Sequence, residues 1–248
     1  MCRKAWVLLA AIGVAVLSRS AGATELPNKA PAAVPAYDWS GLYVGANLGY
    51  GGSRANWTNL RSSPAATFYD ALPGDSFSNR LSGIFGGAQI GYNVQNGRWV
   101  YGIEAMLDAS AINGDHASTF GAADDQFKAN IKALAMVSGR LGYVWDNVLA
   151  YGKAGVAVAN IRASVSDNVP PTTGAGSDNK WLAGPSVGLG VEYGITPRLS
   201  LAVEYDYMRL DSASYQLGGG VGSYLWNLDM RNISIVMAKL NYRINWPR

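Results

Sequence analysis

The sequence contains very little cysteine or histidine and only one long apolar run. Its single cysteine, Cys2, lies in an N-terminal segment that we expect to be removed, so the rest of the chain can form no disulfide. Its single histidine, His116, has no further histidines or cysteines near it in the sequence that would make a metal site. After residue 23, no stretch approaches the roughly 18 uninterrupted apolar residues of a membrane-spanning helix. These absences exclude a disulfide-stapled domain and a helical membrane protein.

The first 23 residues have the order of features found in a secretory signal peptide. Arg3 and Lys4 are positive, an apolar run of about 13 residues follows, and small residues then end in Ala21-Gly22-Ala23. An N-terminal membrane anchor is the alternative, but a spanning helix needs about 20 apolar residues. We therefore predict export, with cleavage after Ala23.

The charge of the exported chain gives no indication of a nucleic-acid partner. The signal peptide holds three bases and no acid, so 17 of the 20 bases remain against 17 acids, without a basic run. Residues 24–38 carry three prolines among alanines, which predicts an extended periplasmic linker. Residues 39–248 are long enough for one domain.

Glycine, tyrosine and tryptophan are abundant, with 30, 14 and 8 residues, and polar and apolar residues alternate with a period of two. Three connections between the alternating segments are tight turns, among them Asn96-Gly97, and four are long. Outer-membrane barrels have this asymmetry, with short turns facing the periplasm and long loops facing outside. We therefore predict an all-β fold, an eight-stranded antiparallel up-and-down transmembrane β-barrel. The expected strands are 39–51, 83–95, 99–111, 128–144, 148–162, 182–194, 199–210 and 231–245, and the long loops are 52–82, 112–127, 163–181 and 211–230.

Charged residues near the strand centres fall on the polar face of each predicted strand. In 99–111, for example, Glu104 and Asp108 oppose Ile103 and Leu107. A soluble sandwich or lipocalin-like barrel is the alternative, since its strands also alternate, but its apolar face would point inward. The near balance of acids and bases favours a shared barrel interior. The predicted interior charge network consists of Glu104, Asp108, Lys132, Arg140, Lys153, Glu192, Glu204, Asp206, Lys239 and Arg243.

This network has two possible roles, an ion-conducting path or a plug of buried salt bridges. Eight-stranded barrels have interiors just wide enough for side chains. Lumen-side glycines such as Gly91 and Gly188 leave room for long basic side chains opposite, so we favour the plug. Arg140 is the expected partner of Glu204.

Aromatic residues gather at the ends of the apolar faces, beside the short turns. This arrangement is typical of the girdle at a membrane interface rather than of a ligand platform. Tyr50, Trp181 and Tyr207 are candidates for the outer girdle. The predicted girdle near the short turns consists of Tyr92, Trp99, Tyr101, Tyr143, Trp145, Tyr193, Tyr242 and Trp246.

Several segments resemble the strands of a known family. Residues 39–50, Trp-Ser-Gly-Leu-Tyr-Val-Gly-Ala-Asn-Leu-Gly-Tyr, closely resemble the opening strand of the small porin-family outer-membrane β-barrels of alphaproteobacteria. These proteins are often called outer-membrane immunogenic proteins and have an OmpA-like transmembrane barrel. Residues 87–93, 101–105 and 203–207 are similar to later strands of the family, and 240–243 resembles its closing strand.

The resemblance implies a location in the outer membrane and a surface-exposed antigen. Pore formation and haemin binding have been attributed to some members, but the quoted motifs carry neither activity. Such barrels usually end on an aromatic residue that the assembly machinery reads. Here the chain continues beyond Trp246 to Arg248, so either Trp246 serves in a shifted frame or assembly is less efficient.

The sequence offers no catalytic or cofactor site. A barrel lipase or protease needs a histidine beside a serine or an aspartate on a rigid scaffold. His116 lies beside Asp115 and Ser118 in a predicted loop, and we interpret it as a solvated loop histidine. The pair Asp124-Asp125 is interpreted as a solvated acidic turn rather than a cation site. We expect no enzymatic activity, no metal and no cofactor.

The sequence therefore predicts a non-enzymatic outer-membrane protein with an envelope-structural, surface-exposed role. A weak porin for small solutes is one alternative, and a ligand-binding protein or adhesin acting through the extracellular loops is another. The expected partners are outer-membrane lipid and lipopolysaccharide, with the barrel-assembly machinery during insertion and no nucleic acid.

Overall fold

The computed structural model describes residues 37–62, 72–117, 125–167, 174–217, 224–230 and 232–244. The chain divides into two units, Met1–Pro35 and Ala36–Arg248, and all described residues belong to the second. The predicted signal peptide with its cleavage site, nearly all of the predicted linker, and Trp246 lie outside the described residues.

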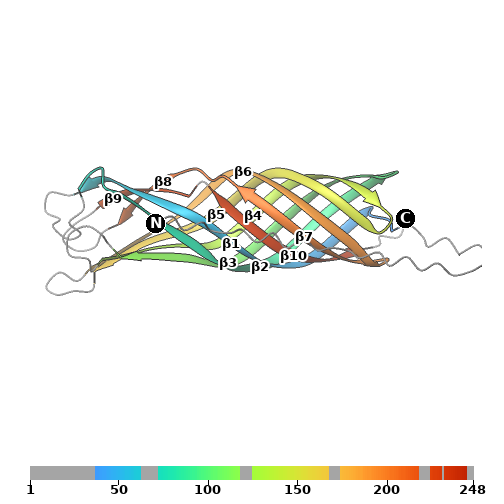
Figure 1. Cartoon of the computed structure of the whole chain (residues 1–248), viewed down its shortest axis with the longest axis horizontal. Helices are drawn as coiled ribbons and strands as arrows, with labels where there is room; N and C mark the ends of the chain where they lie inside the picture. Colours follow the sequence, from blue (N-terminus) through green and yellow to red (C-terminus); the bar gives the residue numbers. More distant parts are fainter. Residues whose placement is uncertain are drawn as a thin grey trace, which may run out of the picture. The chain divides into compact units, whose positions relative to one another are not determined.

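The described residues are almost entirely β-strand (Figure 1). Within them no helix is long and apolar enough to cross a membrane. The strands are β1 Gly41–Ser62, β2 Ser76–Asn96, β3 Trp99–Ala117, β4 Asp125–Trp145, β5 Val148–Asp167, β6 Gly174–Thr196, β7 Leu199–Met208, β8 Ala213–Leu217, β9 Tyr224–Asp229 and β10 Ile233–Ile244.

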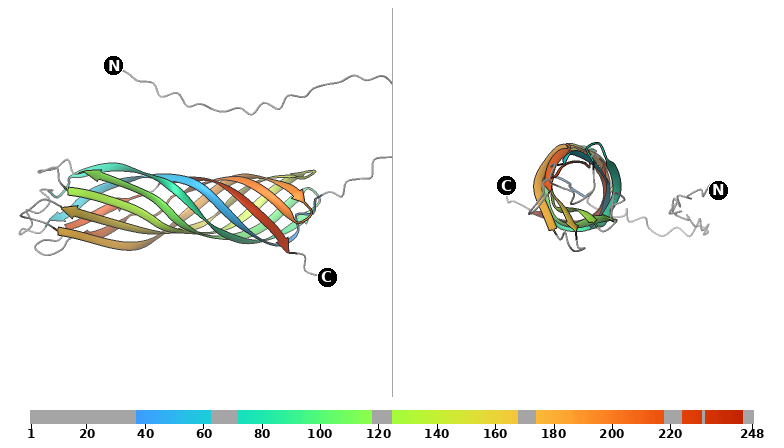
Figure 2. Two further views of the ribbon diagram at one scale, coloured as in Figure 1. Left: turned by 90° about the horizontal axis from the view of Figure 1, so that it is seen from below. Right: turned by 90° about the vertical axis from the view of Figure 1, so that its left-hand side faces the viewer.

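Eight of these strands close into a ring, which the end-on view in Figure 2 shows. Consecutive strands β1 to β7 pair with their neighbours, β7 pairs with β10, and β10 pairs back onto β1, from Leu42 opposite Ile244 to Gly52 opposite Ser234. Every pairing is antiparallel, so the predicted eight-stranded antiparallel β-barrel is confirmed. Closure leaves no free edge, which a sheet in lipid requires because its backbone groups can bond only to one another.

β8 and β9 extend the wall beyond the ring at the end with the long connections. β9 pairs with the outer part of β1, where Asn56 lies opposite Asp229, and β8 pairs with β9. Residues 209–212, between β7 and β8, are not in a strand, and neither are Met230 and Asn232, between β9 and β10. The predicted loop 211–230 is therefore wrong in part, because it contains two strands.

Most strands also run farther outward than the sequence predicted, so the predicted loops 52–82, 112–127 and 163–181 are partly strand. The reason is that the polar and apolar faces of the strands exchange sides. Beyond the lipid-facing band the outward residues become polar, as at Arg54 and Asn56, while the inward residues become apolar, as at Ala55 and Trp57. The alternation continues, but its apolar side now faces the barrel interior.

The three tight turns lie where the sequence places them, at 97–98, 146–147 and 197–198. Gly97 has a φ of 60°, and Asp146 has a φ of 51°. Both residues adopt the left-handed region that tight hairpin turns need, which glycine and aspartate tolerate best.

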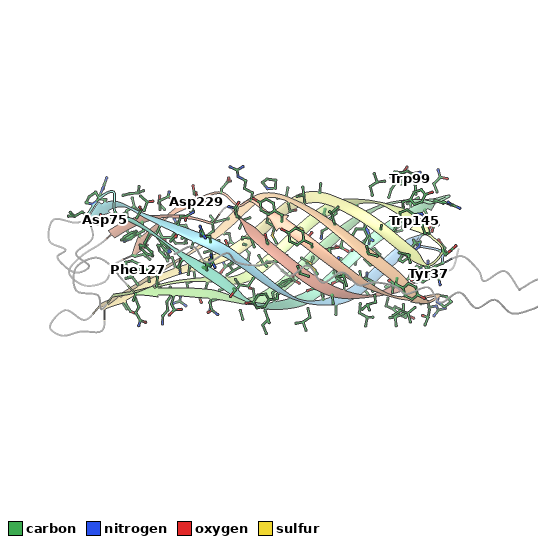
Figure 3. All side chains as sticks on the ribbon, viewed as in Figure 1. Tyr37, Asp75, Trp99, Phe127, Trp145 and Asp229 are labelled. Carbon is green, nitrogen blue, oxygen red and sulfur yellow. The ribbon has the colours of Figure 1, made fainter. Side chains whose placement is uncertain are left out.

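The interior is filled in three layers along the barrel. A small aromatic and aliphatic cluster lies at the short-turn end and includes Tyr37, Trp39 and Tyr151. Buried charges occupy the middle. A large apolar core that includes Trp57, Phe127 and Trp226 fills the half towards the long connections. Figure 3 shows Tyr37, Trp99 and Trp145 at one end of the barrel and Phe127 towards the other.

Candidate functional site: the buried charge network

The centre of the barrel holds two lysines that share three carboxylates. Lys153 Nζ lies 2.5 Å from Glu204 Oε1, 3.1 Å from Asp206 Oδ2 and 3.6 Å from Glu104 Oε1. Lys239 Nζ lies 2.5 Å from Glu104 Oε1 and 3.1 Å from Glu204 Oε2. These side chains come from β3, β5, β7 and β10, so the ion pairs cross the lumen as well as linking neighbouring strands.

A second ion pair lies beside the first group. Arg140 Nη2 lies 2.8 Å from Glu192 Oε2, and the Arg140 guanidinium stacks on the Tyr151 ring at 3.9 Å from its centroid. Glu192 also accepts hydrogen bonds from Ser200 and Asn241. The expected pairing of Arg140 with Glu204 is therefore wrong. The strand register places Arg140 directly opposite Lys153, so Glu204 receives the lysine while Arg140 reaches Glu192.

Hydroxyl and amide groups join the two groups into one network. Tyr43 Oη donates to Glu104 at 2.8 Å and accepts from Arg140 Nη1 at 3.1 Å. Tyr151 Oη donates to Glu204 at 2.6 Å. Asn47 Nδ2 donates to Asp108 at 2.8 Å, which extends the network towards the apolar core. The network therefore crosses the lumen through continuous polar contacts.

Glycines on the lumen face make room for the two tyrosines. A Cβ atom at Gly91 would lie 2.3 Å from Tyr43 Cζ, and one at Gly190 would lie 2.3 Å from Tyr151 Cζ. Both positions therefore need a residue without a side chain, because the rings are held in place by their hydrogen bonds.

The structure places eight of the ten predicted network residues in the buried interior. They are Glu104, Asp108, Arg140, Lys153, Glu192, Glu204, Asp206 and Lys239, and each is exposed by 6% or less. Five of the eight are acids and three are bases, so the buried charge is not balanced as the sequence suggested. Each of the two lysines is accordingly shared between carboxylates, whereas Arg140 forms an ion pair with Glu192 alone.

Two predicted members lie elsewhere. Arg243 is partly buried at the short-turn end, where it donates a hydrogen bond to the Pro197 carbonyl and stacks 5.0 Å from the Tyr37 ring centroid. Lys132 is exposed on the outer wall, which corrects its assignment to the interior. The cause is a β-bulge, because the register shifts between Ile131 and Ala133, and an inserted residue reverses the face of a side chain.

Sequence reasoning left Tyr43, Tyr151, Asn47 and Asn241 out of the network. Tyr43, Asn47 and Asn241 lie on the polar face of their strands, which is the signal that could have placed them inside. Tyr151 has the same parity as Lys153, two residues along the strand, so the same signal applies to it.

The outer half of the interior is closed by aromatic side chains. Phe77, Phe127 and Trp226 pack around Trp57 with ring centroids 5.7 Å, 5.8 Å and 6.4 Å from it. His116 stacks on Phe77 at 4.7 Å with an angle of 13° between the ring planes. His116 is therefore half-buried on β3 and not a solvated loop residue.

The strand conformation also separates the suspected catalytic pair. His116 faces the interior while Asp115 is exposed, because successive residues of a strand point to opposite faces. Ser118 and Asp124 lie outside the described residues. Among those that are described, no three or more His, Cys, Asp or Glu side chains are grouped so that they could hold a metal ion.

The aromatic residues assigned to the girdle near the short turns lie on the outer wall, except Trp246, which is not described. Trp99 packs edge-on against Tyr143 at 5.2 Å, and Tyr143 lies 4.6 Å from Trp145. Tyr92, Tyr101, Tyr193 and Tyr242 are exposed around the same end. At the other end of the lipid-facing band, Tyr50 and Trp181 are exposed and Tyr207 is partly exposed.

The fold and its outward aromatic residues agree with comparisons to known proteins. The model of the outer membrane protein β-barrel domain family matches residues 8–243. The chain belongs to this family. A 22 kDa outer membrane protein of Rhizobium leguminosarum is 32% identical over 80% of this chain and 74% of its own length. A 31 kDa outer-membrane immunogenic protein of Brucella melitensis is 28% identical over 82% of this chain and 86% of its own length.

Solved structures of bacterial outer-membrane proteins are also similar at low sequence identity. OprG of Pseudomonas aeruginosa is 13% identical, with a TM-score of 0.45 over 84% of this chain and 97% of its own. Ail of Yersinia pestis is 11% identical, with a TM-score of 0.40 over 82% of this chain and 99% of its own. The family match and the named relatives, rather than these distant structures, show that the protein is an outer-membrane protein, as its sequence predicts.

Proposed function

We propose that this barrel is a closed, non-enzymatic envelope protein that strengthens the outer membrane and presents its long connections at the cell surface. The observation that supports this role best is the pair of lysines, Lys153 and Lys239, which tie carboxylates of different strands together across the lumen. A conducting pore needs a continuous water-filled path, and these buried contacts leave little room for one.

The apolar core is a second barrier to solutes. Trp57, Phe127 and Trp226 are each exposed by 1% or less and pack against one another inside the outer half. An ion that passed the charge network would also have to displace these rings, which is costly because an ion loses its hydration in apolar surroundings. Both barriers favour the plug over the porin alternative.

The absence of catalysis is part of the same proposal. Glu104, Glu204 and Asp206 are engaged with lysines, and the only histidine stacks on Phe77. None of these side chains is therefore placed to act as a catalytic acid or base.

The partners follow from the location of the barrel. We expect envelope lipid and lipopolysaccharide to be the partners of the folded barrel, with the assembly machinery acting during insertion.

Planar-bilayer conductance of the refolded protein tests the proposal. We expect no steady channel for small ions in symmetric salt. A Lys153→Ala/Lys239→Ala variant, refolded under the same conditions, shows whether the network itself closes the lumen. A large and steady conductance of the unaltered protein would contradict the proposal and favour the porin alternative.

A further inference from the structure

Two arginines lie opposite each other on the outer wall, just beyond the lipid-facing band. Tyr50 of β1 and Ile84 of β2 are register partners and are both strongly exposed, as expected for side chains in contact with lipid. Four residues farther outward on each strand, Arg54 and Arg80 are also register partners and are also exposed. Four residues of a tilted strand correspond to about 10 Å along the barrel axis.

This arrangement of like charges is unfavourable for the isolated protein. Like charges directly opposite each other on one face of an antiparallel pair destabilise it. Among the described residues neither the Arg54 nor the Arg80 guanidinium has an ion-pair partner. An anion bound by both arginines would replace this repulsion with a net attraction.

The surroundings leave the two guanidinium groups open to such an anion. The flanking register pairs are small and polar, with Asn56 opposite Ser78 on the outer side and Gly52 opposite Ser82 on the inner side. β1 and β2 themselves place neither an acid nor a bulky apolar side chain beside the arginines. On the adjoining β3, the exposed Asp115 lies near Arg80 but forms no ion pair with it. Two planar guanidinium groups offer parallel N–H donors that match the oxygens of a phosphate.

The height of the pair indicates where the anion comes from. The long connections mark the extracellular end of an outer-membrane barrel, so Arg54 and Arg80 lie about 10 Å outside the last apolar pair. This is the level of the lipid headgroups rather than of bulk solvent, because hydrocarbon gives way there to a polar interface. We propose that Arg54 and Arg80 form a binding site for a phosphate group of the outer-leaflet glycolipid, lipopolysaccharide. The inference rests on the outer-membrane location and does not depend on whether the barrel conducts.

Lipid binding by arginine variants tests the site. Detergent-solubilised, folded protein is titrated with bis-phosphorylated lipid A, and the bound fraction is measured by native mass spectrometry. Arg54→Gln and Arg80→Gln should each weaken binding about fivefold, and the double variant about 25-fold, as expected for basic residues near an anionic lipid surface. The heat-modifiable shift in gel mobility shows that each variant is folded, and exposed positions of this kind tolerate substitution.

The matched control is Arg98→Gln/Arg198→Gln, which removes the same charge from the exposed short turns at the other end of the barrel. It should bind lipid A as the unaltered protein does. An equal loss in this control would overturn the proposal, because it would show general attraction by net charge. Unchanged binding in Arg54→Gln/Arg80→Gln would overturn it as well.

A second measurement separates a lipid site from a structural role. In phosphatidylcholine vesicles without lipid A, Arg54→Gln should leave the protein as stable as before or more stable, since it relieves repulsion. In vesicles that contain lipid A, the same variant should be less stable than the unaltered protein. Lipid A without phosphates should abolish this difference. Equal stabilisation by inorganic phosphate would refute the lipid assignment.

Discussion

Lys153 Nζ lies 2.5 Å from Glu204 Oε1, yet Glu204 does not depend on this lysine alone, because Lys239 reaches its other oxygen at 3.1 Å. Each lysine in turn contacts Glu104, and Lys153 also contacts Asp206. The network is therefore not a set of separate pairs. The two kinds of charge are also unequal in number, so removing a base and removing an acid have different consequences.

We expect Lys239→Met to destabilise the protein more than Glu204→Gln. Loss of Lys239 leaves Glu104 and Glu204 with Lys153 as their only remaining lysine, whereas loss of the Glu204 charge leaves Lys153 with Asp206 and Lys239 with Glu104. An uncompensated buried charge costs about 3–5 kcal/mol, and a lost hydrogen bond to a charged group costs about 1.5–3 kcal/mol. Reversible urea unfolding in lipid vesicles measures both changes.

Lys132→Met is the matched control for this comparison. Lys132 is exposed on the outer wall, so its loss should change the free energy of unfolding by no more than about 0.5 kcal/mol. A cost for Glu204→Gln that equals or exceeds that of Lys239→Met would show that the lysines are not the limiting partners.

Gly190→Ala should destabilise the barrel by about 1–3 kcal/mol, the range for an overpacked interior. The added methyl group would lie 2.3 Å from Tyr151 Cζ, and this ring cannot move freely because it donates to Glu204 and stacks on Arg140. Gly139→Ala is the control, since the nearest atoms to a Cβ there are 4.0 Å away. Equal thermal stability of the two variants would contradict this account of the lumen glycines.

Leu240→Arg should cost about 2–4 kcal/mol, because Leu240 faces outward near the middle of the lipid-facing band. Asn113→Arg, on the outer wall beyond that band, should cost less than about 1 kcal/mol. Unfolding in vesicles compares the two. Equal costs would mean that the lipid boundary does not lie between these positions. The neighbouring Asn241 is not a suitable control, because it is buried in the lumen and forms hydrogen bonds with Gln89 and Glu192.

Stability should fall as the pH rises above about 10, the ordinary pKa of tyrosine. Burial raises the pKa of Tyr215 on β8, and Asp178 raises it further. The folded protein then keeps a proton that the unfolded chain releases, so folding becomes less favourable at high pH. Tyr215→Phe should reduce this dependence without a large cost at pH 7, since the Tyr215 hydroxyl has no hydrogen-bond partner among the described residues. If the free energy of unfolding of Tyr215→Phe falls as steeply above about pH 10 as that of the unaltered protein, Tyr215 does not cause the pH dependence.

The sequence predicted the ring of strands because polar and apolar residues alternate along every strand segment that has one face towards lipid. The outward aromatic residues and the tight turns at 97–98, 146–147 and 197–198 follow from local rules that need no knowledge of the fold. The same rules failed above the lipid band. There the apolar residues of each strand, such as Trp57 and Phe127, point into the barrel and form a core. Within the lipid band, the apolar residues of the same alternating pattern point outward.

The composition of the candidate site was largely predictable, but its pairings were not. Period-two parity places Glu104, Glu204 and Lys153 inside without any structure. Partners across the lumen depend on the register of several strands, which no single strand encodes. One bulge at Lys132 was enough to move a predicted interior charge to the outer wall.

The position of Lys239 on the last strand of the ring has a consequence for biogenesis. Glu104 lies on β3 and Glu204 on β7, so the counter-charge of Lys239 reaches them only when β10 is paired in the ring. Without a paired β10, the lumen holds one lysine, Lys153, for Glu104, Glu204 and Asp206 and must remain hydrated, because an uncompensated buried charge is costly. Pairing of β10 therefore supplies the missing counter-charge and closes the cylinder together, which couples expulsion of water from the lumen to closure of the barrel.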